Sequence, residues 1–203
     1  MPSEYDPLRR TIDDPLAEDS LERVEELFEA ASRLFLNQPW SWLAWALILP
    51  GAALATPRIL AATGGVGVLL LWSVAVVIGG TIEAVQIIRG RRQRGVESSS
   101  LASWVLRAQG NLSLVAVVVS IALIFQGEAW LLPGIWLLLL GHSLFSLGGL
   151  ASRALRIGGL IYQAGGLLAI WPHGRGLVFF AAATLLGNLL IAWSIWREKS
   201  GSR

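Results

Sequence analysis

The stretch ALRIGGLIYQAGGLLAIWPHG, residues 154–174, carries two glycine pairs one heptad apart, with a tyrosine and a glutamine between them. The pairs are Gly158-Gly159 and Gly165-Gly166. In lipid the hydrophobic effect does not drive helices together, so helices associate through close van der Waals packing. Small residues permit that packing because they let the backbones approach closely. The spacing therefore predicts a helix that packs tightly against its neighbours. The alternative interpretation is a hinge, or an unwound site of the kind that transporters use.

The composition of the whole chain favours lipid as its solvent. Hydrophobic residues make up 54% of the 203 residues and charged residues 15%, against roughly 25% charged residues in ordinary soluble proteins. A globule of this size cannot hide that much apolar surface from water. The chain has no cysteine, which excludes disulfides, thiolate metal sites and a cysteine nucleophile.

Six apolar segments follow the first forty residues, and each is a candidate transmembrane helix. They span roughly 40–55, 58–82, 104–126, 130–150, 154–171 and 176–196. A span needs about 20 residues, so the first and fifth are short. Pro50 is expected to kink the first. Tight connections at Thr56-Pro57, Gly127-Glu128 and Pro172 to Gly174 predict three helical hairpins. The predicted fold is an all-α, polytopic membrane bundle of six transmembrane helices in residues 40–203.

Residues 1–39 form a separate acidic segment with ten acids and four arginines. Within residues 15–36 an apolar stripe recurs at helical spacing, made of Leu21, Val24, Leu27, Phe28, Ala31, Leu34 and Phe35. This pattern predicts an amphipathic helix on the cytoplasmic side. Its acidic face is unsuited to anionic lipid. We therefore expect the helix to dock on the Arg89–Arg94 loop of the same chain or on a protein partner.

The basic residues set the predicted orientation. With six spans, fourteen of the sixteen Lys and Arg residues fall on the side that also holds the N-terminus, and only Arg58 and Arg175 fall on the other. The positive-inside rule then places both termini in the cytoplasm. Tryptophans near the segment ends are typical of interfacial belts: Trp40, Trp42, Trp104, Trp130, Trp171 and Trp196.

Polar residues inside spans are costly and are candidate functional residues. Glu83 lies near the end of the second segment, and Arg107 and Asn111 lie near the start of the third. Because the two segments are consecutive, these groups should lie at similar depth, and Glu83 is predicted to pair with Arg107. Such a pair is read as an interfacial salt bridge, with a polar site near the cytoplasmic side as the alternative.

Three further polar residues lie at mid-span: His142, Gln163 and Asn188. They are read as interhelical hydrogen-bonding groups, and a small polar cleft is the alternative. His142 lies about twelve residues below the outer end of its helix, about 18 Å from the loop that holds His173. A bis-histidine haem or metal site is therefore not expected.

Chemical motifs are scarce. The sequence contains no HExxH, no G-x-S-x-G and no phosphate-binding loop. No catalytic residue, cofactor, metal ion or nucleic-acid partner is therefore predicted. The expected partners are the lipid bilayer, a protein partner for the acidic helix and a second copy of the chain.

The stretch from Leu131 to Pro172 runs from a Pro-Gly-x-Trp helix start through a Gly-rich helix, a short basic turn and a second Gly-rich helix that ends near a proline. It resembles a group of uncharacterised bacterial six-helix integral membrane proteins over residues 131–172. The resemblance implies a bacterial inner membrane and carries no activity over to this chain.

The sequence thus predicts a multi-pass protein of the bacterial inner membrane without enzymatic activity, acting as a scaffold, accessory or regulatory subunit. The alternative is a small-solute transporter or channel that uses the intramembrane polar residues. Convergence of those residues on one cavity would favour transport, and dispersal among separate helices would favour the scaffold.

Overall fold

The structure is a computed structural model that describes residues 39–94, 100–150, 152–171 and 174–201. Every regular element in these ranges is a helix, and no strand occurs within them. The acidic segment predicted at residues 1–39, with its amphipathic helix, lies outside the described residues apart from Pro39.

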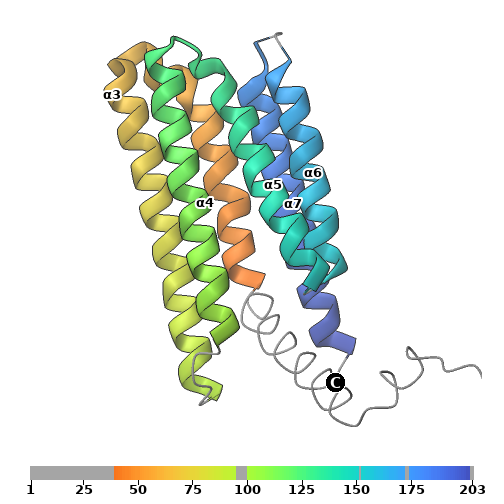
Figure 1. The fold of residues 1–203 in the computed structure, drawn as a ribbon. Helices are drawn as coiled ribbons and strands as arrows, with labels where there is room; N and C mark the ends of the chain where they lie inside the picture. Colours follow the sequence, from red (N-terminus) through yellow and green to blue (C-terminus); the bar gives the residue numbers. More distant parts are fainter. Residues whose placement is uncertain (1–38, 95–99, 151, 172–173, 202–203) are drawn as a thin grey trace, which may run out of the picture.

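Five α-helices and one short 3₁₀ helix make up the described chain (Figure 1). They are α3 (Pro39–Arg94), α4 (Ser100–Phe125), η1 (Ala129–Leu131), α5 (Leu132–Leu150), α6 (Arg153–Ile170) and α7 (Gly176–Gly201).

Helix α3 turns back on itself at Gly64, whose φ of 70° and ψ of −163° are not helical. A first limb, residues 39–63, runs along the bundle, and a second limb, residues 65–94, returns beside it (Figure 1). Two hydrogen bonds join the limbs, from Trp72 to Thr56 and from Trp45 to Glu83. In each bond the two residues are equally distant from Gly64 along the chain. This symmetry is the register of an antiparallel helical hairpin centred on that glycine.

The predicted count of six helices and the predicted turn at Thr56-Pro57 are therefore wrong. The first two predicted segments belong to one element of 56 residues, which continues through Pro50 and Pro57. A proline costs a helix one hydrogen bond but keeps a helical φ. Gly64 adopts a positive φ that other residues avoid, so the chain reverses at the glycine.

The other two predicted turns are confirmed, and both contain a glycine with positive φ. Gly127, with a φ of 80°, lies between α4 and η1, and Gly174, with a φ of 71°, lies between α6 and α7. Three hairpins thus follow one another along the chain: the two limbs of α3, then α4 with α5, then α6 with α7.

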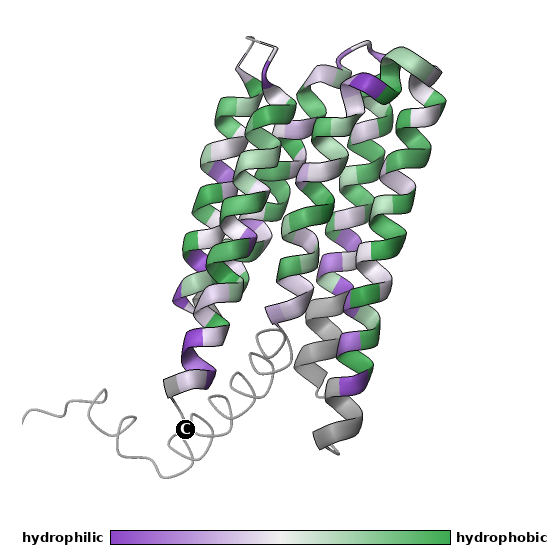
Figure 2. Cartoon of the chain, turned by 180° about the vertical axis from the view of Figure 1, so that it is seen from behind, coloured by the Kyte–Doolittle hydropathy of each residue, from purple (hydrophilic) through white to green (hydrophobic). Residues whose placement is uncertain are grey.

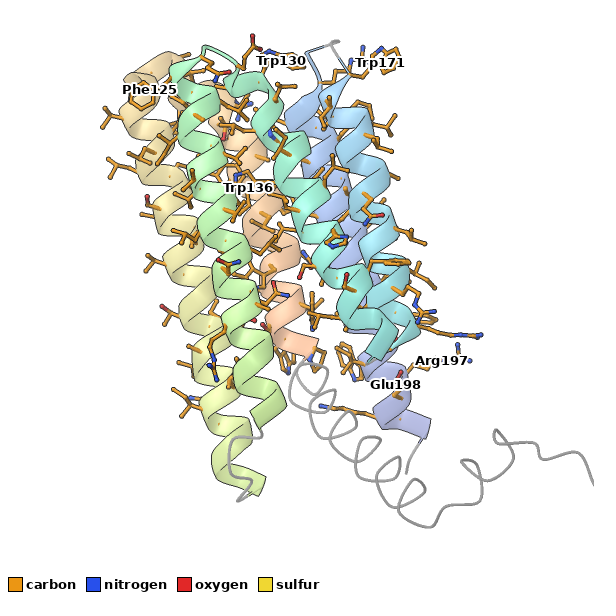
Figure 3. All side chains as sticks on the ribbon, in the orientation of Figure 1. Phe125, Trp130, Trp136, Trp171, Arg197 and Glu198 are labelled. Carbon is orange, nitrogen blue, oxygen red and sulfur yellow. The ribbon has the colours of Figure 1, made fainter. Side chains whose placement is uncertain are left out.

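The hairpins place most charged groups of the described residues near the two ends of the bundle. The rings of Trp40 and Trp196 lie 6.1 Å apart, so the start of α3 and the end of α7 share one end. Trp130 and Trp171 lie at the opposite end from Arg197 and Glu198 (Figure 3). Figure 2 shows apolar residues along most of each helix and the strongest polar patches near the ends.

Helix α6 packs against α5 on one face and α7 on another, and its glycines make this possible. A methyl group added to Gly159 would lie 2.5 Å from the backbone nitrogen of Phe145 in α5. One added to Gly158 would lie 2.8 Å from the side chain of Ile191 in α7. A side chain at Gly159 would strike the backbone of α5, and one at Gly158 would displace the end of the Ile191 side chain. The prediction that these glycines serve close packing is confirmed.

Helix α7 also packs against the first limb of α3, and the core lies between these elements. Leu137, Tyr162 and Phe180, from α5, α6 and α7, form one buried cluster with Ala53 from the first limb. The ring of Trp72, from the second limb, meets Phe180 edge-on at 5.5 Å. The core therefore joins the three hairpins near the middle of the bundle.

Four segments in the described chain are long and apolar enough to cross a membrane: Pro39–Arg89, Arg107–Phe125, Ala129–Gly148 and Gly176–Ser200. A straight helix of 51 residues would measure about 75 Å, more than twice the hydrocarbon thickness of about 30 Å. The bend at Gly64 divides this first segment into two limbs. Helix α6, with two arginines in its first turn and four glycines, is not among the four.

Candidate intramembrane polar sites

A deeply buried polar pair lies between α6 and α7, where Tyr162 and Asn188 are 3% and 1% exposed. The two side chains lie next to each other. Gly187 makes the approach possible, because a methyl group there would lie 2.5 Å from the Tyr162 ring. Both residues lie near the middle of their helices, so the pair sits at mid-depth in the bundle.

The amide nitrogen of Asn188 has no hydrogen-bond partner among the described residues. Thr184 is one helical turn away and fully buried, but its hydroxyl donates to the carbonyl of Phe180 at 2.8 Å. An unsatisfied buried N–H is costly. This N–H is therefore the one group in the described core with spare capacity to bind a neutral acceptor.

A second polar contact lies within α3, where the predicted site residue Glu83 accepts a hydrogen bond from the Trp45 indole N–H at 3.2 Å. The Trp45 ring covers Gly79, at which any added methyl group would collide with it. The glycine thus clears the space that lets Trp45 reach the carboxylate one turn further on. Arg107 is exposed on α4, and its pairing with Glu83 stays a prediction.

A third set joins α4 to α5. The side-chain amide of Gln109 donates to the hydroxyl of Ser143, and the Trp136 indole N–H donates to the hydroxyl of Ser120 at 2.9 Å. Trp136 lies between the two helices in the middle of the bundle (Figure 3). Asn111, two residues after Gln109, is exposed.

The indole–hydroxyl contact of this set repeats one in α3. Thr56 and Trp72 are bonded at a separation of 16 residues, and so are Ser120 and Trp136, displaced by 64 positions along the chain. Both hydroxyls donate to the carbonyl four residues earlier, and both of these earlier residues are buried alanines, Ala52 and Ala116. We call each such arrangement an indole clasp. The first two hairpins are thus held together by the same device.

The last two predicted residues lie on the α5–α6 pair. His142 is exposed on α5, and Gln163 is half-buried on α6, where it packs against Gly141, the residue before His142. Asn188 lies against Tyr162, on another face of α6 from Gln163. The structure therefore brings Gln163 beside the His142 turn and places Asn188 elsewhere, so these three do not line one cleft.

Sequence reasoning missed Tyr162, Trp45 and both indole clasps. The glycines opposite the rings were the available signal, because Gly187 and Gly79 each stand where an aromatic ring needs space. Spacing within one helix cannot reveal which ring from another helix fills that space. Among the described residues, no group of three or more His, Asp or Glu side chains could hold a metal ion.

Comparisons with protein-family models, with characterised proteins and with solved structures find no match for this chain.

Proposed function

We propose that this chain is a non-enzymatic, multi-pass protein of the bacterial inner membrane that acts as a scaffold, accessory or regulatory subunit. The observation that carries the proposal is the dispersal of its intramembrane polar groups. Glu83 bonds within α3, Gln109 bonds between α4 and α5, and Asn188 lies buried between α6 and α7. Polar groups that are distributed over separate hairpins contribute to helix packing, whereas a transport path requires polar groups that converge on one cavity.

The proposed topology has six transmembrane segments, with both termini in the cytoplasm. These segments are the two limbs of α3 together with α4, α5, α6 and α7, and α6 is included because it packs lengthwise against α5 and α7. The support for this orientation is the distribution of charge over the two ends of the bundle. The end that holds Trp40 and Trp196 also holds Arg153, Arg156 and Arg197, and the other end holds Arg175. An excess of basic residues on one side is typical of the cytoplasmic face.

Reporter fusions test this topology. A reporter active only in the cytoplasm should work when fused after Arg203, and one active only after export should work when inserted at Gly174. The reverse pattern would overturn the proposed orientation. An exported reporter inserted at Gly64 should also work, and its failure would contradict the division of α3 into two spans.

Purification in a mild detergent tests the scaffold role. The tagged chain should retain a second membrane protein in a fixed ratio, and an unrelated multi-pass protein with the same tag should not retain it. Deleting the gene for the retained protein, or for this chain, should give the same cellular defect. A chain that purifies alone and carries a solute across liposome membranes would contradict the proposal.

One observation favours the alternative function, a small-solute transporter or channel. Asn188 has a free amide N–H, and Pro50, which has no N–H, leaves the carbonyl of buried Ala46 without its usual helical donor. The first limb and α7 run antiparallel, with Trp40 against Trp196, which brings Ala46 and Asn188 to a similar level. Liposome flux that Asn188→Leu abolishes would establish this alternative.

A further inference from the structure

The outer face of the α5–α6 pair carries polar side chains. In the proposed membrane placement this face contacts acyl chains, which offer these side chains no hydrogen-bond partner. His142 and Ser146 are exposed one helical turn apart on α5, and the half-buried Gln163 on α6 packs against Gly141, the residue before His142. Neither His142 nor Gln163 forms a hydrogen bond with another described residue. We call these three residues the polar face.

The depth of the polar face excludes lipid headgroups as its partner. His142 lies near the middle of the 19-residue helix α5, and Gln163 near the middle of the 18-residue helix α6. His142 is about 12 Å and Gln163 about 10 Å from the nearer end of its helix, within a hydrocarbon layer about 30 Å thick. Acyl chains offer no donor or acceptor there, so a protein surface must supply the partners.

The geometry points to a second copy of this chain as that partner: we propose that the polar face is the centre of a symmetric dimer. A neutral imidazole, an amide and a hydroxyl each carry both a donor and an acceptor. The face is therefore complementary to itself, and a two-fold axis along the membrane normal would pair each group with one from the other copy. That axis also keeps both copies in the same orientation in the membrane.

The backbone beneath the polar face holds its groups at fixed positions. A methyl group added to Gly141 would lie 2.8 Å from the carbonyl oxygen of Gly159, and one added to Gly166 would lie 2.9 Å from that of Gly134. The two helices are thus packed backbone to backbone over most of their length. A preorganised surface loses less conformational entropy on association than a mobile one.

Cysteine cross-linking tests the dimer, and the chain suits it because it contains no cysteine. Ser146→Cys places a thiol on the polar face with little change in shape. Ser113→Cys is the matched control, since Ser113 is also exposed but lies on α4, away from the face. Oxidation in native membranes should convert Ser146→Cys to a disulfide-linked dimer of this chain and leave Ser113→Cys monomeric.

A second arm measures the contribution of the polar groups. His142→Leu with Gln163→Leu should raise the dissociation constant of the dimer in liposomes about tenfold, since interhelical hydrogen bonds in lipid are individually modest. Asn111→Leu, an exposed amide outside the face, should leave the constant unchanged. The melting temperature of each variant in detergent checks that its bundle is intact.

Three outcomes would overturn the dimer: a wild-type chain that stays monomeric, equal cross-linking at both positions, or a cross-link from Ser146→Cys only to a different protein. The inference rests on the proposed membrane placement but not on the choice between scaffold and transporter. A dimer that retains no partner and carries a solute would therefore contradict the scaffold alone. A monomer that retains a partner would contradict the dimer alone.

Discussion

The indole N–H of Trp72 donates a 3.1 Å hydrogen bond to the hydroxyl of Thr56 across the bend of α3, and both residues are eight positions from Gly64. The same hydroxyl donates to the carbonyl of Ala52 at 2.8 Å. The Thr56 hydroxyl thus donates within its own limb and accepts from the returning limb. The Ser120–Trp136 clasp between α4 and α5 works in the same way.

Removal of the α3 clasp should show a measurable coupling between its two residues. Thr56→Val and Trp72→Phe each delete one side of the bond, and we expect a coupling free energy of about 0.6 kcal/mol in a double-mutant cycle. Unfolding in mixed detergent micelles supplies the free energies. Additive effects would show that the bond makes no net contribution to stability.

Substitution of the glycine at the bend should destabilise the α3 hairpin through backbone strain alone. A methyl group on Gly64 would meet no atom within 4 Å, but the φ of 70° with a ψ near 180° is nearly restricted to glycine. Gly64→Ala should therefore cost about 1–3 kcal/mol. Gly65→Ala is the control, because Gly65 has equal space and no positive φ. An equal loss at both positions would refute the strain argument.

Alanine at Gly159 should also destabilise the bundle, but through steric contact with α5 rather than through backbone strain. Gly159→Ala would push a methyl group to 2.5 Å from the Phe145 nitrogen and 2.7 Å from the Gly141 oxygen. Because backbone cannot yield as a side chain can, we expect a loss of about 1–3 kcal/mol. Gly80→Ala, with no atom within 4 Å, should be neutral or slightly stabilising. The thermal melting of both variants, measured by helical circular dichroism, decides.

The buried Tyr162–Asn188 pair should lose more free energy of unfolding when Tyr162 alone is substituted than when both residues are substituted. Tyr162→Phe removes the hydroxyl beside Asn188, leaves the buried amide against an apolar ring, and should cost about 1–2 kcal/mol. Asn188→Leu in the same chain removes that orphaned amide at nearly constant volume and should recover part of the loss. Unfolding free energies of the two single variants and the double variant test this. A double variant weaker than Tyr162→Phe would show that Asn188 bonds to another group.

The predicted Glu83–Arg107 pair can be tested without disturbing Trp45. Glu83→Gln keeps an oxygen that can accept the indole N–H while removing the charge. We expect a loss of about 1 kcal/mol, because Arg107 is exposed and ion pairs at such positions are weak. Glu83→Gln with Arg107→Gln should recover part of it. A cycle in which the two losses simply add would rule out a direct pair.

The sequence by itself determined the helical class, the apolar segments and two of the three turns, because these depend on properties local to the chain. Side-chain hydropathy over about 20 residues marks an element able to cross lipid. A glycine between two such elements, as at Gly127 and Gly174, permits the positive φ of a tight reversal. The close packing of Gly158 and Gly159 was likewise legible from their spacing.

Only the tertiary structure decided where α3 reverses and which polar groups meet. By sequence, Pro57 and Gly64 can each interrupt a helix. The hydrogen bonds from Trp72 to Thr56 and from Trp45 to Glu83 form only if the chain reverses at Gly64. Partner choice depends on how helices are rotated and shifted against one another, which no periodicity within one helix encodes. For that reason Asn188 lies beside Tyr162 rather than sharing a cleft with His142.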